Sequence, residues 1–307
     1  MRSEEYVVAI DLGSNTLRVL VYDCHSEKTL GMYEKVVKTA DGLAEHDFIN
    51  DAAVERVIAA LHESRRQLGI SYDGANAVTT ESLRRASNSA KVLSRIKEET
   101  GADFSVISGQ EEARLTLLAV KHRLKKLQHA AKSFVLVDIG GGSSELIFSF
   151  PDKVISRSFP VGIVTIAQTY SDLESIGQAL EQEMLDIERF CTETYAEEGR
   201  VDAFVATAGT PTTVAAMKLG QTYDCYNPKK INGTILFREE LDFYLNKLLK
   251  LPFKEREVIV GVGRSDLIAA GILIYKRFFD IVESSQCVIV DDGLREGVAL
   301  YACASEV

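Results

Sequence analysis

Apolar runs alternate with longer segments of helical periodicity along most of the chain. The first half opens with three consecutive apolar runs, which predict strands, and then interleaves helices with further strands. Strands alternating with helices are typical of an α/β fold. The predicted strands of this half are 7–10, 17–22, 29–37, 75–78 and 104–107, and its predicted helices are 52–68, 91–99 and 111–127.

The second half repeats this order of elements. It begins with a predicted hairpin and a third strand, so each half starts as an antiparallel meander. We therefore expect two domains of similar design, domain I at 1–125 with a C-terminal helix at 293–307, and domain II at 126–292. The predicted elements of the second half are the hairpin at 134–150, strands at 153–159, 202–206 and 287–290, and helices within 162–196, after 210, at 264–279 and from 294 onward.

The same loop follows the first strand of each half. It reads D-L-G-S-N-T at 11–16 and D-I-G-G-G-S at 138–143. Glycine lets backbone amide groups approach an anion and hydroxyls add donors, so both hairpin tips are suited to phosphate. A glycine-rich turn that only reverses the chain would explain one copy. An aspartate at the same place in both copies indicates a carboxylate that holds or positions Mg²⁺ against the phosphates.

Three other segments offer candidate chemistry, each with a simpler explanation. Glu111 and Glu112 open a helix, where acidic residues stabilise the dipole, but a carboxylate there could also serve as a general base. Arg84 in 79–88 could bind phosphate or lie exposed on a helix. The small-residue turn at 208–213 suits a phosphate at a helix N-terminus, while its proline also fits plain helix initiation. The basic run at 121–132 could guide a polyanion or be a solvated helix end.

Composition narrows the class of protein. The 307 residues are enough for two buried cores, and 46% hydrophobic with 26% charged residues is ordinary for a globular protein. No apolar run is long enough to span a bilayer, and the start lacks the layout of a signal peptide, so we expect a cytoplasmic protein without a membrane partner. A net charge of −10 disfavours nucleic acid as a partner.

The cysteines and histidines give no sign of a metal or disulfide framework. The five cysteines form no C-x-x-C pair and are odd in number, so we expect buried, reduced packing residues. The five histidines lack H-x-x-x-H spacing, which leaves a zinc site little support. Any metal is therefore expected to have oxygen ligands.

Taken together, five segments resemble the exopolyphosphatase and guanosine pentaphosphate phosphatase (Ppx/GppA) family along nearly the whole chain. The two aspartate loops alone also resemble the wider actin, sugar kinase and Hsp70 superfamily. The S-G-Q-E-E-A-R segment followed by the second loop narrows the resemblance. The segments are D-L-G-S-N-T at 11–16, T-x-x-x-R-x-A-x-N at 80–88, S-G-Q-E-E-A-R at 108–114, D-I-G-G-G-S-S-E at 138–145 and D-G-L-R-E-G at 292–297.

The resemblance implies an α/β fold of two actin-like (ribonuclease H-like) domains with the active site in a cleft between them. It implies hydrolysis of a terminal phosphoryl group from polyphosphate or from guanosine pentaphosphate or tetraphosphate, with Mg²⁺ as the cofactor. Mn²⁺ is equally compatible with oxygen ligands, and a homodimer is compatible with the family. At 307 residues the chain resembles the short members that lack C-terminal helical domains, which puts processive action on very long polyphosphate in doubt.

The resemblance also carries roles onto individual residues. Glu112 matches the family's catalytic base, and Glu145 matches the acidic residue that closes the second loop and serves in catalysis and metal binding. Asp11 and Asp138 would position Mg²⁺ or water. The implied phosphate-binding residues are Gly13, Ser14, Asn15, Thr16, Arg18, Arg84, Gly140, Gly141, Gly142, Ser143, Ser144, Gly209, Thr210 and Arg264.

Three other functions stay open at this stage. A kinase or ATPase of the same superfamily would use both loops for ATP, and a kinase would require an acceptor. A non-catalytic alarmone or nucleotide sensor would use cleft closure as its signal, although it would not need the two glutamates. An actin-like or Hsp70-like assembly protein would need an additional region that is not evident in the sequence.

Overall fold

The computed structural model describes residues 6–170, 172–265 and 267–305, and these divide into two compact units. Unit 1 contains the described residues up to Ala119 and those from Leu294 onward, and unit 2 is Val120–Gly293. The first crossing between units therefore lies inside one continuous helix, α5 (Gly109–Lys126), and not at the predicted 125/126. The apolar periodicity of α5 continues unchanged across the boundary between the units. The sequence pattern therefore contains no signal for this position.

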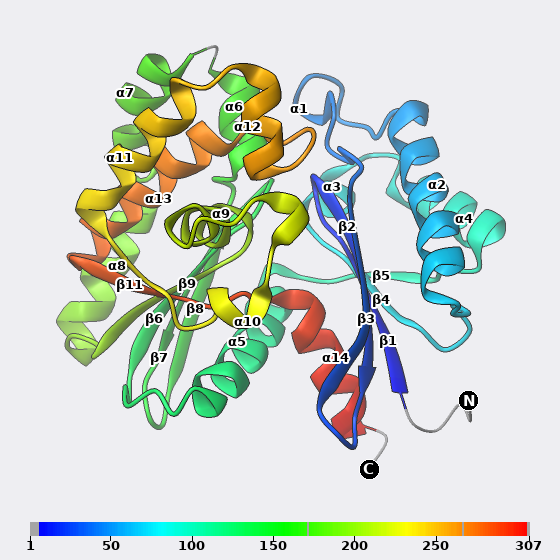
Figure 1. Ribbon diagram of the computed structural model, residues 1–307, viewed down its shortest axis with the longest axis horizontal. Helices are drawn as coiled ribbons and strands as arrows, with labels where there is room; N and C mark the ends of the chain where they lie inside the picture. Colours follow the sequence, from blue (N-terminus) through cyan, green and yellow to red (C-terminus); the bar gives the residue numbers. More distant parts are fainter. Residues whose placement is uncertain (1–5, 171, 266, 306–307) are drawn as a thin grey trace. The chain divides into compact units, whose positions relative to one another are not determined.

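Unit 1 is built on a five-stranded sheet in the order β3-β2-β1-β4-β5. The first three strands form the predicted antiparallel meander, and β4 and β5 join β1 in parallel. Figure 1 shows α14, in red, on one side of this sheet and α2 with α4 on the other. The elements are β1 (Tyr6–Leu12), β2 (Thr16–Asp23), β3 (Lys28–Val36), α1 (Leu43–His46), α2 (Asp51–Leu68), β4 (Asn76–Thr79), α3 (Glu81–Arg85), α4 (Ser89–Thr100), β5 (Phe104–Val106) and α14 (Leu294–Ser305).

Unit 2 repeats the strand order of unit 1 and adds one strand. Its sheet runs β10-β11-β9-β6-β7-β8, with β6, β7 and β8 as the meander and β9 and β11 parallel to β6. The two copies of the aspartate loop thus sit on the same hairpin of the same topology. The strands are β6 (Phe134–Ile139), β7 (Ser144–Ser149), β8 (Val154–Phe159), β9 (Ala203–Thr207), β10 (Ile235–Phe237) and β11 (Gln286–Ile289).

The helices of unit 2 cover a large apolar core. The central helix α13 contributes Tyr275, Phe278 and Phe279, all nearly inaccessible, to the cluster beneath the sheet. The structure adds elements between 219 and 263, a region to which the sequence pattern assigned none. The helices are α6 (Ile163–Thr169), α7 (Leu173–Glu183), α8 (Leu185–Glu198), α9 (Gly209–Lys218), the 3-10 turn η1 (Tyr223–Cys225), α10 (Pro228–Ile231), α11 (Arg238–Leu249), α12 (Phe253–Val260) and α13 (Ile268–Val282).

The expectation of five reduced, buried cysteines is wrong. Cys24 and Cys303 form a disulfide between the end of β2 and the last turn of α14, both in unit 1. The other three are free, with Cys191 and Cys287 buried and Cys225 exposed. An odd count excludes a fully paired framework but not one bond. The two partners are 279 positions apart, so no local spacing rule could identify them.

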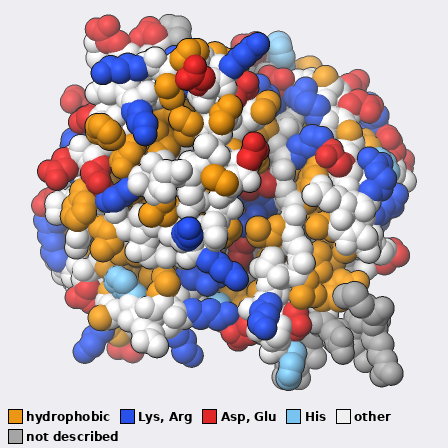
Figure 2. Space-filling view, viewed as in Figure 1, with side chains coloured by type: hydrophobic (Ala, Val, Ile, Leu, Met, Phe, Trp, Pro, Cys, Tyr) orange, Lys and Arg blue, Asp and Glu red, His pale blue; other side chains and the backbone are white. Residues whose placement is uncertain are grey.

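Acidic and basic side chains are interspersed over the face shown in Figure 2. No helix among residues 6–170, 172–265 and 267–305 combines the length and apolar character that a membrane span requires. The most exposed large apolar side chains lie on and next to α11 and α12, where Phe243 is 62% and Val262 is 74% exposed.

The crossing of α14 over α5 in unit 1 requires a glycine at position 297. A Cβ on Gly297 would lie 2.0 Å from the carbonyl oxygen of Leu115, which is rigid helix backbone. We expect Gly297→Ala to lower the free energy of unfolding by about 1–3 kcal/mol, measured by urea denaturation. Gly177→Ala is the control, because a Cβ on this α7 glycine meets nothing within 4 Å. Gly177→Ala should raise the free energy of unfolding by about 0.5–1 kcal/mol. An equal rise in Gly297→Ala would contradict the close approach of α14 to the Leu115 carbonyl.

Candidate active site

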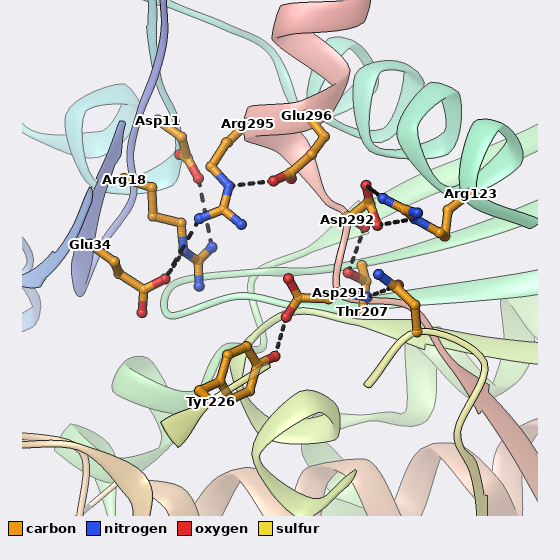
Figure 3. Close-up of polar contacts among 11 residues, drawn as sticks. Asp11, Arg18, Glu34, Arg123, Thr207, Tyr226, Asp291, Asp292, Arg295 and Glu296 are labelled. Atoms are coloured by element: carbon orange, nitrogen blue, oxygen red, sulfur yellow. Dashed lines mark hydrogen bonds and ion pairs between the residues drawn. The ribbon is translucent and has the colours of Figure 1, made fainter. Parts of the chain in front are cut away.

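A row of charged side chains, here called the Asp11 row, begins at the aspartate of the first loop and crosses the strands of unit 1. Asp11 on β1 is paired in register with Arg18 on β2, which is paired in turn with Glu34 on β3. Arg18 donates through Nε to Glu34 Oε2 at 3.1 Å, and its Nη1 lies 3.7 Å from Asp11 Oδ2. Arg295 on α14 adds a second guanidinium, with Nη1 3.9 Å from Glu34 Oε2 (Figure 3). Burial raises the pKa of Asp11, and the charges of Arg18 and Arg295 oppose the rise.

The tip of this loop is fixed by backbone hydrogen bonds. The amide of Gly13 donates to the carbonyl of Thr16, which closes the turn. The amides of residues 37 and 38 donate to the carbonyl of Asn15, and the amide of residue 40 donates to that of Ser14. Because the segment after β3 holds these carbonyls, the tip has a defined conformation. The role of residues 13–16 in binding phosphate stays a prediction.

The predicted catalytic base and a predicted phosphate-binding arginine lie together in unit 1. Glu112, in the first turn of α5, is only 9% exposed. Arg84 Nη1 lies 3.5 Å from Glu112 Oε2 and donates to the carbonyl of Ile107 at 2.7 Å. Its Nε and Nη2 donate to Glu81 Oε2 at 3.2 and 2.6 Å. Arg84 is thus held by several protein groups, with a quarter of its side chain exposed.

The two adjacent glutamates of α5 have different surroundings. Glu111 accepts two hydrogen bonds from Arg114, and the side chains of Glu111 and Arg114 are 37% and 47% exposed. This is the helix-surface ion pair expected of an acidic residue in a first helical turn. Glu112 faces inward toward Arg84, and its amide donates to the Ser108 carbonyl. The surroundings therefore single out Glu112 as the candidate base.

The second aspartate loop carries a matching row across unit 2, with different chemistry. Asp138 on β6 is paired in register with Glu145 on β7, and Glu145 with Ser158 on β8. On the other side of Asp138 is Thr207 on β9. Asp138 is 8% and Glu145 only 1% exposed. Two carboxylates thus lie side by side where unit 1 has an aspartate beside an arginine.

The tip of the second loop is also tied down, here by the start of α6. The amide of Ile163 donates to the carbonyl of Gly140, and the amide of residue 164 to that of Gly141. Ser144 Oγ donates to the carbonyl of residue 161 at 2.6 Å, so its hydroxyl is committed to the protein backbone. A Cβ on Gly162 would lie 2.4 Å from the Gly141 oxygen, which shows how closely the two segments pack. Phosphate binding at 140–144 stays a prediction.

Two other predicted phosphate-binding positions lie on different elements of unit 2. Thr210, in the first turn of α9, is 1% exposed, and its hydroxyl oxygen packs against Gly271 of α13. The preceding Ala208 has φ 72 and ψ −174, a conformation that strains any residue other than glycine. Arg264 stacks over the ring of Tyr223 at 5.4 Å. The phosphate roles of Thr210 and Arg264, like that of Gly209, stay predictions.

Sequence reasoning missed the contacts of the segment 291–297, which contains D-G-L-R-E-G. In unit 2, Arg123 binds the Asp292 carboxylate through Nε at 2.6 Å and Nη2 at 2.9 Å. Thr207 Oγ1 donates to the Asp292 carbonyl, and Tyr226 bonds Asp291 (Figure 3). In unit 1, Arg295 of the same segment reaches the Asp11 row. The segment resembled the family motif, but its partners lie far away in sequence and no local pattern could name them.

Comparisons with known proteins identify the family of the chain. A model described as the Ppx/GppA phosphatase family matches residues 21–306. "Exopolyphosphatase 1" of Mycobacterium bovis is 27% identical, over 97% of this chain and 88% of that protein. A "putative exopolyphosphatase" of Haemophilus influenzae is 30% identical, over 95% of this chain and 90% of its own length.

The fold is shared with a solved member of the same family. The crystal structure of the Aquifex aeolicus Ppx/GppA family member superposes with a TM-score of 0.72, at 28% identity over 98% of each chain. The predicted α/β fold with two actin-like domains is confirmed by this match and by the repeated strand order. This chain therefore belongs to the Ppx/GppA phosphatase family.

Proposed function

We propose that the chain is an exopolyphosphatase, which uses water and Mg²⁺ to remove the terminal phosphate of inorganic polyphosphate. The observation that carries this proposal is the buried Glu112 of unit 1, held beside the Arg84 guanidinium at 3.5 Å. A base next to a fixed cation is suited to activate water near an anion. The relatives named exopolyphosphatases support polyphosphate as the first substrate to test.

The reaction would be phosphoryl transfer to water. Such transfer depends on an in-line nucleophile and on neutralising the charge of the transferred group more than on covalent chemistry from the protein. Glu112 would accept a proton from the attacking water. Arg84 and the amides of the loop tip at 13–16 would stabilise the phosphoryl oxygens, and the leaving group would be the polyphosphate shortened by one phosphate. Neither Glu112 nor Arg84 needs to form a bond to phosphorus.

The carboxylates of unit 2 fit the proposed metal ion. Mg²⁺ usually keeps several waters and is bound in proteins by one or two carboxylates together with substrate phosphates. Asp138 and Glu145 supply two neighbouring, buried carboxylates. Within the described parts of the chain no three His, Cys, Asp or Glu side chains gather as a metal site, so substrate and water would complete the coordination. Mg²⁺ bound there would neutralise charge on the phosphates, and Mn²⁺ fits the same ligands.

Asp11 has a different environment from the carboxylates of unit 2. The Arg18 guanidinium lies 3.7 Å from its Oδ2, and Arg295 adds a second positive charge nearby. A carboxylate facing two cations is better placed to orient water or Arg18 than to be the main ligand of a divalent ion. Arg18, which Glu34 holds through a hydrogen bond, would bind phosphate.

The experiment that tests the function measures phosphate release with Mg²⁺ and without an acceptor. Short polyphosphate, long polyphosphate, guanosine pentaphosphate and ATP are compared in parallel. We expect release from polyphosphate. Release from guanosine pentaphosphate alone would reassign the substrate. Release from none of the four would favour an acceptor-dependent kinase or a nucleotide sensor and would overturn the proposal.

A further inference from the structure

Ser158 on β8 makes a side-chain contact that no motif of the sequence foreshadows. Its Oγ donates to Glu145 Oε1 at 2.7 Å, from the strand that pairs with the one carrying Glu145. Ser143 Oγ, from the loop tip, donates to the same oxygen at 2.8 Å. Glu145 is 1% exposed. A buried carboxylate therefore has two hydroxyl donors on one of its oxygens.

Two donors on one oxygen fix the orientation of the carboxylate plane. The last torsion of glutamate is broad and roughly two-fold, so an unrestrained carboxylate samples many directions. Donors from two different elements, the loop tip and β8, select one of them. Fixing Oε1 in this way also fixes the direction in which Oε2 points. Hydrogen-bond partners that orient a metal-binding carboxylate typically contribute 10- to 100-fold to metal affinity.

Unit 1 provides an independent parallel for the same position. On its hairpin, the residue of the second strand that pairs with the loop aspartate is Arg18, and the third-strand residue paired with Arg18 is Glu34. In unit 1, Arg18 of the second strand donates to Glu34 of the third. In unit 2, Ser158 of the third strand donates to Glu145 of the second. In both units the third strand thus holds the charged side chain of the second strand. The chemistry differs but the register is the same.

We propose that Ser158 is a positioning residue that orients Glu145 toward a divalent cation. The inference rests on the proposed function, in which Glu145 and Asp138 hold the metal ion. Ser158 itself touches neither the metal nor the substrate in this proposal. Its effect is exerted through Glu145, so removing its hydroxyl should weaken metal binding while leaving the chemical step largely intact once metal is saturating.

The test compares Ser158→Ala with two matched variants. Ser158→Thr keeps a hydroxyl on a strand position that tolerates a β-branched side chain. Ser156→Ala makes the same deletion two residues earlier on β8, opposite Ile147. Mn²⁺ binding is measured directly by electron paramagnetic resonance on the full chain, without substrate, and Asp138→Asn serves as the variant expected to lose the site. Thermal unfolding shows whether each variant keeps its fold.

We expect Ser158→Ala to raise the Kd for Mn²⁺ by about tenfold, with Ser158→Thr and Ser156→Ala close to the wild type. The Mg²⁺ concentration for half-maximal phosphate release should rise by a similar factor, and kcat at saturating Mg²⁺ should change little. An unchanged Kd in Ser158→Ala, or no Mn²⁺ binding by the wild type, would overturn the inference.

The same data separate this inference from the proposed function. Wild-type phosphate release with an unchanged Kd in Ser158→Ala removes the positioning role but leaves the hydrolase. A raised Kd with no phosphate release from any substrate keeps the positioning role but removes the hydrolase. A tenfold loss in Ser158→Thr as well would mean that the position is sensitive to shape and not to its hydroxyl, and would overturn the inference.

Discussion

Glu112→Gln should lower kcat for phosphate release on the order of a hundredfold or more, while the KM for polyphosphate stays within about threefold. Glutamine keeps the size of the side chain and a carbonyl oxygen for the place beside Arg84, but it cannot take a proton from the attacking water. The loss therefore falls on the chemical step. Steady-state kinetics on a short polyphosphate with saturating Mg²⁺ measure both parameters.

Glu111→Gln is the matched control for this variant. It makes the same chemical change one residue earlier on α5, where the carboxylate is exposed and bonded to Arg114. Its removal costs a surface ion pair, which is worth about 0–1 kcal/mol of stability and should not affect turnover. Equal losses in both variants would point to damage at the start of the helix. An unchanged kcat in Glu112→Gln would refute the general-base role.

The sequence pattern predicted most elements because their periodicity is local. The meanders of both units and helix α2 follow directly from apolar spacing. The short elements of the segment 219–263 were missed for a physical reason, because their stability comes from tertiary contacts. Strand β10, for example, has three residues and exists only because it pairs with β11. A pattern search within the segment has no access to that partner. Helix α11 in the same segment has 12 residues and was missed although it is not short.

The candidate site was predicted in part for the same reason. The aspartate loops stand in compact motifs that a local reading of the chain selects, whereas Glu112 was chosen over Glu111 only through the resemblance to the family. Ser158, Glu34 and Arg295 acquire their roles from strand register or from helix packing across the chain. Arg84 was expected to face either phosphate or solvent, whereas the structure fastens it to Glu81 and the Ile107 carbonyl beside Glu112.

Removing the Cys24–Cys303 disulfide should lower the free energy of unfolding of unit 1 by about 5 kcal/mol. The variant is Cys24→Ser with Cys303→Ser, and Cys225→Ser is the control because that cysteine is exposed and free. The bond fastens the last turn of α14 to the end of β2, and α14 also carries Arg295. Urea denaturation of the variant, and of the wild type with and without a thiol reductant, measures the loss.

The size of this effect depends on how the two units unfold. A cross-link stabilises mainly by restricting the unfolded chain, and the restriction grows with the length of the closed loop. The loop here spans 279 positions and includes all of unit 2. If unit 2 stays folded while unit 1 unfolds, roughly one hundred residues of the loop remain flexible and the loss approaches 5 kcal/mol. If both units unfold together, the loss is larger by less than about 1 kcal/mol, because it grows only with the logarithm of the loop length. Five reactive thiols in the denatured wild type without reductant, in place of three, would show that the bond does not form in solution.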